Sequence, residues 1–182
     1  MADALAMAEG GTADKLVLLA GAYFHDVVNP PKDSPLRSQA SRLAAAKAVE
    51  LLTEMDFDTA KLDGVAHAIA AHSFSAGIPT ETPEAKILQD ADRMEALGAI
   101  GLARVFYVSG RLNRPPFDAV DPLCKNRTPD DSLYGVDHFF TKLLKLPAQM
   151  QTESGKRMAA ERAEVLTGYL QTLERELTAP AP

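Results

Sequence analysis

The hydrophobic pattern of the chain centres on residues 16–28 (LVLLAGAYFHDVV), where eleven of thirteen residues are apolar or glycine. A helix that is apolar on nearly every side is typical of a protein core. The two exceptions are His25 and Asp26, and helical spacing gives each of them only apolar neighbours on its own face. An unpaired buried carboxylate is costly, so the sequence predicts a buried helix whose polar pair is compensated by another group. The predicted inner stripe of this helix comprises Leu16, Leu19, Ala20, Tyr23, Phe24 and Val27.

Helical periodicity also predicts the other elements of the chain. The expected helices cover residues 2–9, 35–55, 59–72, a long helix from 83 whose face continues to 103, 133–146 and 152–177. Their predicted N-caps are Thr12 or Asp14 for the central helix, Ser34 and Thr82. Residues 109–132 have no apolar periodicity and are expected to form a long ordered loop, a kind that is uncommon unless it is functional. The fold class is therefore all-α, with a single domain over residues 1–178 and a frayed tail at 179–182.

The long helix that begins at Pro83 carries the second candidate for a buried acid. One face of it consists of Ala85, Leu88, Asp92, Ala96, Ala99 and Ala103, and only Asp92 is polar. Asp90 lies about 200° away around the helix, on a mixed face. The pattern therefore predicts that Asp92, and not Asp90, is the buried carboxylate.

Composition narrows the classes of partner. The chain of 182 residues carries a net charge of −6, which argues against a nucleic-acid partner held by bulk electrostatics. Cys124 is the one cysteine, so a disulfide within the chain is excluded. The sequence has no signal-peptide pattern and no apolar run long enough for a bilayer, which predicts a cytoplasmic protein without a membrane partner. The oligomeric state does not follow from the residues.

A divalent cation would compensate the predicted buried acids. Two carboxylates in one core repel each other, and a cation between them removes this repulsion and also explains the imidazole beside them. His25, Asp26 and Asp92 suit an octahedral ion such as Mn²⁺, Mg²⁺ or Fe²⁺. Such an ion polarises a phosphoryl oxygen and acidifies its water, as phosphoester hydrolysis requires. The alternative is that Asp26 pairs with its own His25 or with an arginine in the core.

Four motifs in order resemble those of the bacterial stand-alone HD-domain phosphohydrolases. They are YFHD at residues 23–26, AHSFS at 71–75, AKILQDADRMEALGAIG at 85–101 and DHFFTKLLKLP at 137–147. The resemblance covers roughly residues 2–175. It implies an all-α helical bundle that hydrolyses phosphate esters or nucleotide anhydrides. It also implies that His25, Asp26 and Asp92 are metal ligands and that His72 faces the site.

The sequence departs from the family pattern at two positions. The family carries a further ligand His on a preceding helix, and in this chain that residue would fall just upstream of Met1. Either the chain lacks its N-terminal part, or the site has three ligands or is defunct. The second departure is Asn29, where alarmone-hydrolysing relatives carry an acid, which counts against alarmone hydrolysis.

The remaining polar residues supply candidates for catalysis and substrate binding. His72 and Arg93 are the predicted catalytic residues. The alternative for His72 is that it only caps the C-terminus of its helix, where an imidazolium is favoured. Surface exposure alone is the alternative for the predicted phosphate-binding residues, which are Lys32, Arg37, Arg42, Lys142 and Lys145. His67 is interpreted as a surface or packing residue and Cys124 as incidental.

Two functional hypotheses follow. The first is a divalent-metal-dependent phosphohydrolase in which metal-bound water attacks a small phosphorylated substrate, such as a nucleotide. The second is a degenerate HD-fold module that binds nucleotides or regulates without catalysis, which the missing first His supports.

Overall fold

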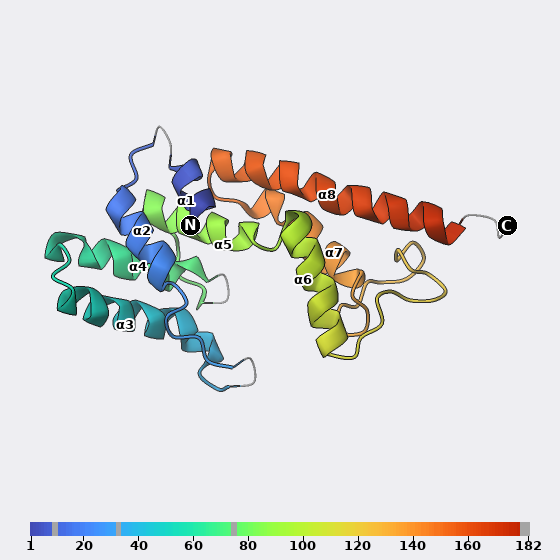
Figure 1. Cartoon of the computed structure of the whole chain (residues 1–182), viewed down its shortest axis with the longest axis horizontal. Helices are drawn as coiled ribbons and strands as arrows, with labels where there is room; N and C mark the ends of the chain where they lie inside the picture. The colour runs from blue at the N-terminus through green and yellow to red at the C-terminus, as the bar shows by residue number, and fades with distance from the viewer. Residues whose placement is uncertain (9–10, 32–33, 74–75, 179–182) are drawn as a thin grey trace. The chain divides into compact units, whose positions relative to one another are not determined.

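The described residues form the all-α fold that the sequence predicted, and short 3-10 helices occur between the α-helices. The computed structural model describes residues 1–8, 11–31, 34–73 and 76–178, and no strand occurs among them (Figure 1). The predicted tail at 179–182 lies outside the described residues, as does Lys32. The α-helices are α1 (Ala2–Met7), α2 (Lys15–Phe24), α3 (Ala40–Glu54), α4 (Leu62–His72), α5 (Pro83–Met94), α6 (Gly98–Arg111), α7 (Asp137–Thr141) and α8 (Glu153–Thr178).

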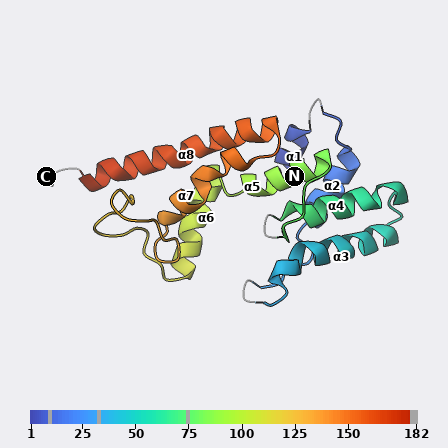
Figure 2. The ribbon, with the colours of Figure 1, turned by 180° about the vertical axis from the view of Figure 1, so that it is seen from behind.

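The chain divides into two compact units, Met1–Asp92 and Arg93–Pro182, and the division falls inside α5. In the first unit α3 and α4 lie side by side, as Figures 1 and 2 both show, and α2 packs against α4. These helices enclose a core of small and branched side chains. Its buried members include Val17, Ala20, Ala44, Ala48, Leu52, Val65, Ala68, Ile69 and Leu88.

Helix α2 is shorter than predicted and shows a different face to the core. Asp14 caps it by accepting hydrogen bonds from the backbone N–H groups of Leu16 and Val17. The helix ends at Phe24, so His25 is its C-cap and Asp26 lies in the turn beyond. The predicted inner stripe is wrong at Leu16, Tyr23 and Val27, which are exposed, and confirmed at Ala20. The buried residues of α2 are Val17, Leu18, Ala20 and Gly21.

A glycine lies on the buried face of α2. A Cβ atom on Gly21 would lie 3.1 Å from Leu88 Cδ2 of α5, so glycine lets the two helices approach closely. Since almost every position in this stretch is apolar, hydrophobic periodicity could not select one face.

The predicted long helix from Pro83 is in fact two helices. Leu97 is extended (φ −111°, ψ 170°) and Gly98 adopts a left-handed φ of 68°, which ends the helical path between α5 and α6. A Cβ atom on Gly101 would lie 2.2 Å from the carbonyl oxygen of Ala96, so the turn needs glycine there as well. Residues beyond Met94 therefore do not share a face with Asp92.

Other helix boundaries also differ from the prediction. The expected helix at 59–72 begins with a 3-10 helix, η2 (Thr59–Lys61), and becomes α-helical at Leu62. The expected helix at 35–55 begins with a 3-10 helix, η1 (Arg37–Gln39), and becomes α-helical only at Ala40. The expected helix at 133–146 is reduced to α7, because the backbone leaves helical geometry at Lys142 (φ −134°) and continues as 3-10 turns. The predicted helix at 152–177 is confirmed as α8.

An aromatic cluster joins the helices of the second unit. Phe106 of α6, Phe139 of α7 and Tyr169 of α8 have ring centroids 5.6 to 6.4 Å apart. Such separations are typical of favourable aromatic pairs. The cluster fixes α7, which follows the long loop, against α6 and α8.

The glycine turn between α5 and α6 can be tested by a pair of substitutions. We expect Gly101→Ala to lower the free energy of unfolding by about 2 to 3 kcal/mol, because the new methyl group collides with a backbone carbonyl. The matched control is Gly168→Ala, at an exposed position in α8 with open space around it, which should raise stability by about 1 kcal/mol. Urea unfolding followed by circular dichroism measures both. Equal effects of the two substitutions would contradict this account of the turn.

Candidate active site

The histidines at the ends of α2 and α4 are held in the same way. His25 Nδ1 lies 3.0 Å from the carbonyl oxygen of Ala22, and His72 Nδ1 lies 2.6 Å from that of Ile69. A carbonyl oxygen can only accept, so in both rings Nδ1–H is the donor. In the neutral imidazole each Nε2 atom therefore carries a lone pair.

Both Nε2 atoms face the carboxylate of Asp26. His25 Nε2 lies 4.0 Å from one carboxylate oxygen, and His72 Nε2 lies 4.0 Å from the other. The two imidazole rings meet edge to face with centroids 5.1 Å apart. His72 is buried, whereas the Asp26 side chain is 56% exposed. We call His25, Asp26 and His72 the HD triad.

The predicted burial of the acids is wrong. Asp26 is exposed because α2 ends two residues before it, and Asp92 is only half-buried. Asp90, assigned to a mixed face, is fully buried. The periodicity argument failed because it extended the face of Asp92 beyond Met94, where the helix ends. Because water solvates the charge of Asp26, burial gives no reason for a cation beside it.

His25 and Asp26 carry an imidazole nitrogen and carboxylate oxygens, which are donor types that bind divalent ions. Metal-bound histidines commonly donate their second ring N–H to a backbone carbonyl, as His25 and His72 do. A gap of 4.0 Å is too long for a hydrogen bond and close to twice the usual bond of about 2.1 Å between such an ion and a nitrogen or oxygen ligand. Within the described residues, however, no group of three His, Cys, Asp or Glu side chains is placed so that it could hold a metal ion. The assignment of His25, Asp26 and Asp92 as ligands stays a prediction.

Two interactions hold the end of α4 that carries His72. Gln89 of α5 donates from Nε2 to the carbonyl oxygen of Ala71, at 3.0 Å. His67 accepts a hydrogen bond from the backbone N–H of Glu81, at 3.1 Å, so its interpretation as a packing residue agrees with the structure. Both contacts join α4 to the segment that leads into α5 or to α5 itself.

The predicted phosphate-binding residues have different surroundings. Arg37 donates to the side-chain oxygen of Asn29 and, at 3.0 Å, to the carbonyl oxygen of Pro30. Arg42 is exposed on α3. Lys142 and Lys145 are exposed in the second unit. The binding roles of these residues, and of Lys32, stay predictions.

Arg93, the other predicted catalytic residue, lies at the start of the second unit. Its guanidinium group donates to the carbonyl oxygen of Gln149. This bond gives Arg93 a structural role beside α8, and its catalytic role stays a prediction.

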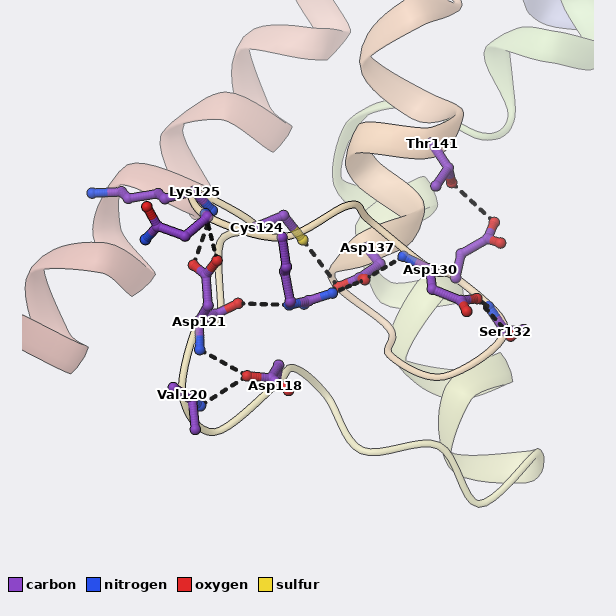
Figure 3. A network of polar contacts seen from close by, with 12 residues as sticks. Asp118, Val120, Asp121, Cys124, Lys125, Asp130, Ser132, Asp137 and Thr141 are labelled. Atoms are coloured by element: carbon purple, nitrogen blue, oxygen red, sulfur yellow. Dashed lines mark hydrogen bonds and ion pairs between the residues drawn. The ribbon is translucent and has the colours of Figure 1, made fainter.

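A polar cluster in the long loop was missed by the sequence analysis. The fully buried carboxylate of Asp137 accepts two hydrogen bonds from Arg127, at 2.5 and 2.7 Å, and one from the backbone N–H of Asp130, at 2.6 Å. The thiol of Cys124 also donates to Asp137, at 3.3 Å, so the interpretation of this cysteine as incidental is wrong (Figure 3). We call these four residues the Asp137 cluster.

Titration in the Asp137 cluster follows from its contacts. Burial acts to raise the pKa of Asp137, but the hydrogen bonds from Arg127 and the Asp130 N–H outweigh it and hold the pKa below its usual value. Burial and the neighbouring carboxylate raise the pKa of the Cys124 thiol to about 11. The thiol is therefore protonated near neutral pH and unsuited to nucleophilic attack.

The Asp137 cluster generates a prediction about stability and pH. Asp137→Asn should lower the free energy of unfolding near neutral pH by about 3 kcal/mol, because it leaves the Arg127 guanidinium without its buried counter-charge. Because the pKa of Asp137 is lower in the folded than in the unfolded protein, ionised Asp137 stabilises the fold at pH values above the unfolded-state pKa of about 4. This stabilisation is lost as the pH falls from there through the folded-state pKa. The variant should therefore lose less stability than the wild type on acidification, in urea titrations at several pH values. Lys47→Ala, which removes an exposed ion pair on α3, is the control, and an equally small effect at Asp137 would contradict the prediction.

Comparisons with known proteins agree with this architecture. The YpgQ protein of Bacillus subtilis is 28% identical over 169 residues, which are 91% of this chain and 74% of that protein. A crystal structure of YpgQ in complex with ADP matches with a TM-score of 0.74 and covers 98% of this chain and 85% of that one, at 28% identity. An HD-superfamily hydrolase from Bacillus thuringiensis matches with a TM-score of 0.74 at 27% identity, over 98% of this chain and 82% of that one.

The described helices include none that is both long enough and apolar enough to cross a membrane.

The model of the HD domain matches residues 1–97, the segment that contains the whole HD triad. This chain therefore belongs to the HD domain family.

Proposed function

We propose that this chain is a divalent-metal-dependent phosphohydrolase whose substrate is a small phosphorylated molecule, in the first place a nucleotide. The observation that carries the proposal is the HD triad, in which two imidazole Nε2 atoms face one carboxylate at 4.0 Å. The neighbours with hydrolase names support the reaction class. The ADP complex of YpgQ supports a nucleotide as the ligand.

The residues of the triad have separate tasks in this proposal. Asp26 and His25 hold a divalent ion, which when bound neutralises phosphoryl oxygens and acidifies water. His72 is fixed through Nδ1, so its Nε2 atom can take up or deliver a proton at the reacting phosphate. The imidazole of His72 is buried, whereas the neighbouring carboxylate of Asp26 is in contact with solvent.

The net charge of −6 bears on the choice of substrate. An acidic surface disfavours a polyanion such as nucleic acid, whereas a few local cations can still bind one or two phosphate groups. Arg42 is exposed in the unit that contains the HD triad and is the proposed phosphate ligand.

One observation favours the second candidate, a nucleotide-binding module without catalysis. Among the residues that the structure describes, no set of three possible ligands is arranged for a metal ion. A chain that binds ADP but neither binds Mn²⁺ nor hydrolyses nucleotides would support this alternative.

Activity and metal binding of two variants test the first proposal. We expect the purified protein to hydrolyse at least one member of a panel of nucleoside mono-, di- and triphosphates in the presence of Mn²⁺, and to lose this activity with a chelator. Asp26→Asn should reduce kcat by about 100-fold or more and weaken Mn²⁺ binding in calorimetry, with little change in Tm because the side chain is exposed. Lys47→Ala is the control for an exposed charge in the same unit. Full activity of Asp26→Asn would exclude the proposed site.

Asp90 and Asp92 can be separated by matched substitutions. Asp92→Asn should weaken Mn²⁺ binding and activity with little loss of stability, if Asp92 is a ligand, because the residue is only half-buried. Asp90→Asn should lower Tm, because it changes a fully buried carboxylate. Thermal unfolding and Mn²⁺ calorimetry measure both variants. The reverse pattern would assign the ligand to Asp90.

A further inference from the structure

The loop that follows α2 contains a chain of side-chain contacts that ends on the HD triad. Asn29 Nδ2 donates to Asp26 Oδ2 at 3.3 Å. Arg37 donates from Nη1 to Asn29 Oδ1 and to the carbonyl oxygen of Pro30. The carboxamide of Asn29 thus lies between the guanidinium of Arg37 and the carboxylate of Asp26.

The orientation of the carboxamide follows from hydrogen-bond chemistry. A guanidinium group can only donate, so the oxygen of Asn29 must face Arg37. A carboxylate can only accept, so the NH₂ group of Asn29 must face Asp26. Arg37 therefore excludes the flipped amide, which would place an oxygen against the carboxylate of Asp26.

This contact sets the carboxylate of Asp26 in the triad. The oxygen that accepts from Asn29 is the one that lies 4.0 Å from His25 Nε2, and the other oxygen lies 4.0 Å from His72 Nε2. The Asp26 side chain is exposed, so without Asn29 its carboxylate would be free to rotate away from both imidazoles. The bond from Arg37 to Pro30 holds the backbone next to Asn29.

We infer that Asn29 and Arg37 are positioning residues for Asp26, with Arg37 acting through Asn29. The inference rests on the proposed function, in which Asp26 is a metal ligand. Groups that orient a ligand commonly change metal affinity by 10- to 100-fold when they are removed. The competing interpretation is the one from the sequence, that Arg37 binds a phosphate group of the substrate.

The two interpretations predict different changes in two affinities. Calorimetry of the full chain with Mn²⁺ alone reports on the positioning of Asp26, and calorimetry with ADP in saturating Mn²⁺ reports on phosphate binding. We expect Asn29→Ala to weaken the Mn²⁺ affinity about tenfold. Arg37→Ala should weaken it in the same direction, and the double variant should bind Mn²⁺ no more weakly than Asn29→Ala does, because the two residues act in series. Arg157→Ala, an exposed arginine of α8, should change neither affinity.

Each result decides between the interpretations. Wild-type Mn²⁺ affinity together with weaker ADP binding in Arg37→Ala would make Arg37 a phosphate ligand and overturn the inference. Independent, additive losses in the double variant would also overturn it. A wild type that binds no Mn²⁺ removes the proposed function and this inference together, whereas variants that bind Mn²⁺ like an active wild type remove the inference alone.

A stability check protects the comparison from misfolding. Thermal unfolding of each variant should give a Tm near that of the wild type, because Asn29 and Arg37 are exposed. If Arg37→Ala fails to fold, Arg37→Lys replaces it, because lysine keeps the charge and can donate hydrogen bonds but lacks the planar guanidinium fork. Its Mn²⁺ affinity should lie between those of the wild type and Asn29→Ala, and an affinity at or below that of Asn29→Ala would overturn the inference.

Discussion

The candidate site depends on where two helices end. His25 and His72 each hydrogen-bond to a carbonyl oxygen three residues earlier, in the last turn of α2 and of α4. The helix ends therefore fix both rings, and the packing of α2 on α4 brings the rings edge to face. Gly21 of α2 faces Ala68 of α4 in this packing, and a Cβ on Gly21 would lie 3.9 Å from the Ala68 methyl group, at ordinary van der Waals distance. Core packing thus positions the chemistry.

The sequence predicted the fold class, the helix start at Thr82 and, as one of two candidates with Thr12, the cap of α2 at Asp14. Helix caps are local signals, and the structure has both: Asp14 accepts from Leu16 and Val17, and Thr82 accepts from Ala85. The break at Gly98 was not predicted, because its flanks continue the helical pattern of apolar positions on both sides. The buried face of α2 was not predicted either, because an apolar stretch without contrast offers no periodicity to use.

The site itself was predicted for a reason that the structure does not support. The argument required a buried carboxylate at Asp26, and the side chain is 56% exposed. The support for these residues as ligands is therefore the resemblance of the His-Asp motif to a family, and not a buried charge that needs a cation. The ion pair between Arg127 and Asp137 was not predicted, because it joins residues ten positions apart across an irregular loop, where the sequence has no periodic pattern.

The two polar centres differ in whether their carboxylates are satisfied. Asp137 accepts from a guanidinium, a backbone N–H and a thiol within 3.3 Å, and such a saturated buried group holds a loop in one conformation. Asp26 has a donor at 3.3 Å, and two imidazole Nε2 atoms face it at 4.0 Å, beyond hydrogen-bond distance. A protein that needed only stability from His25 and His72 would gain more by closing these gaps. The carboxylate of Asp26 is thus only partly satisfied, whereas that of Asp137 is fully hydrogen-bonded, and this difference separates the candidate site from the structural cluster.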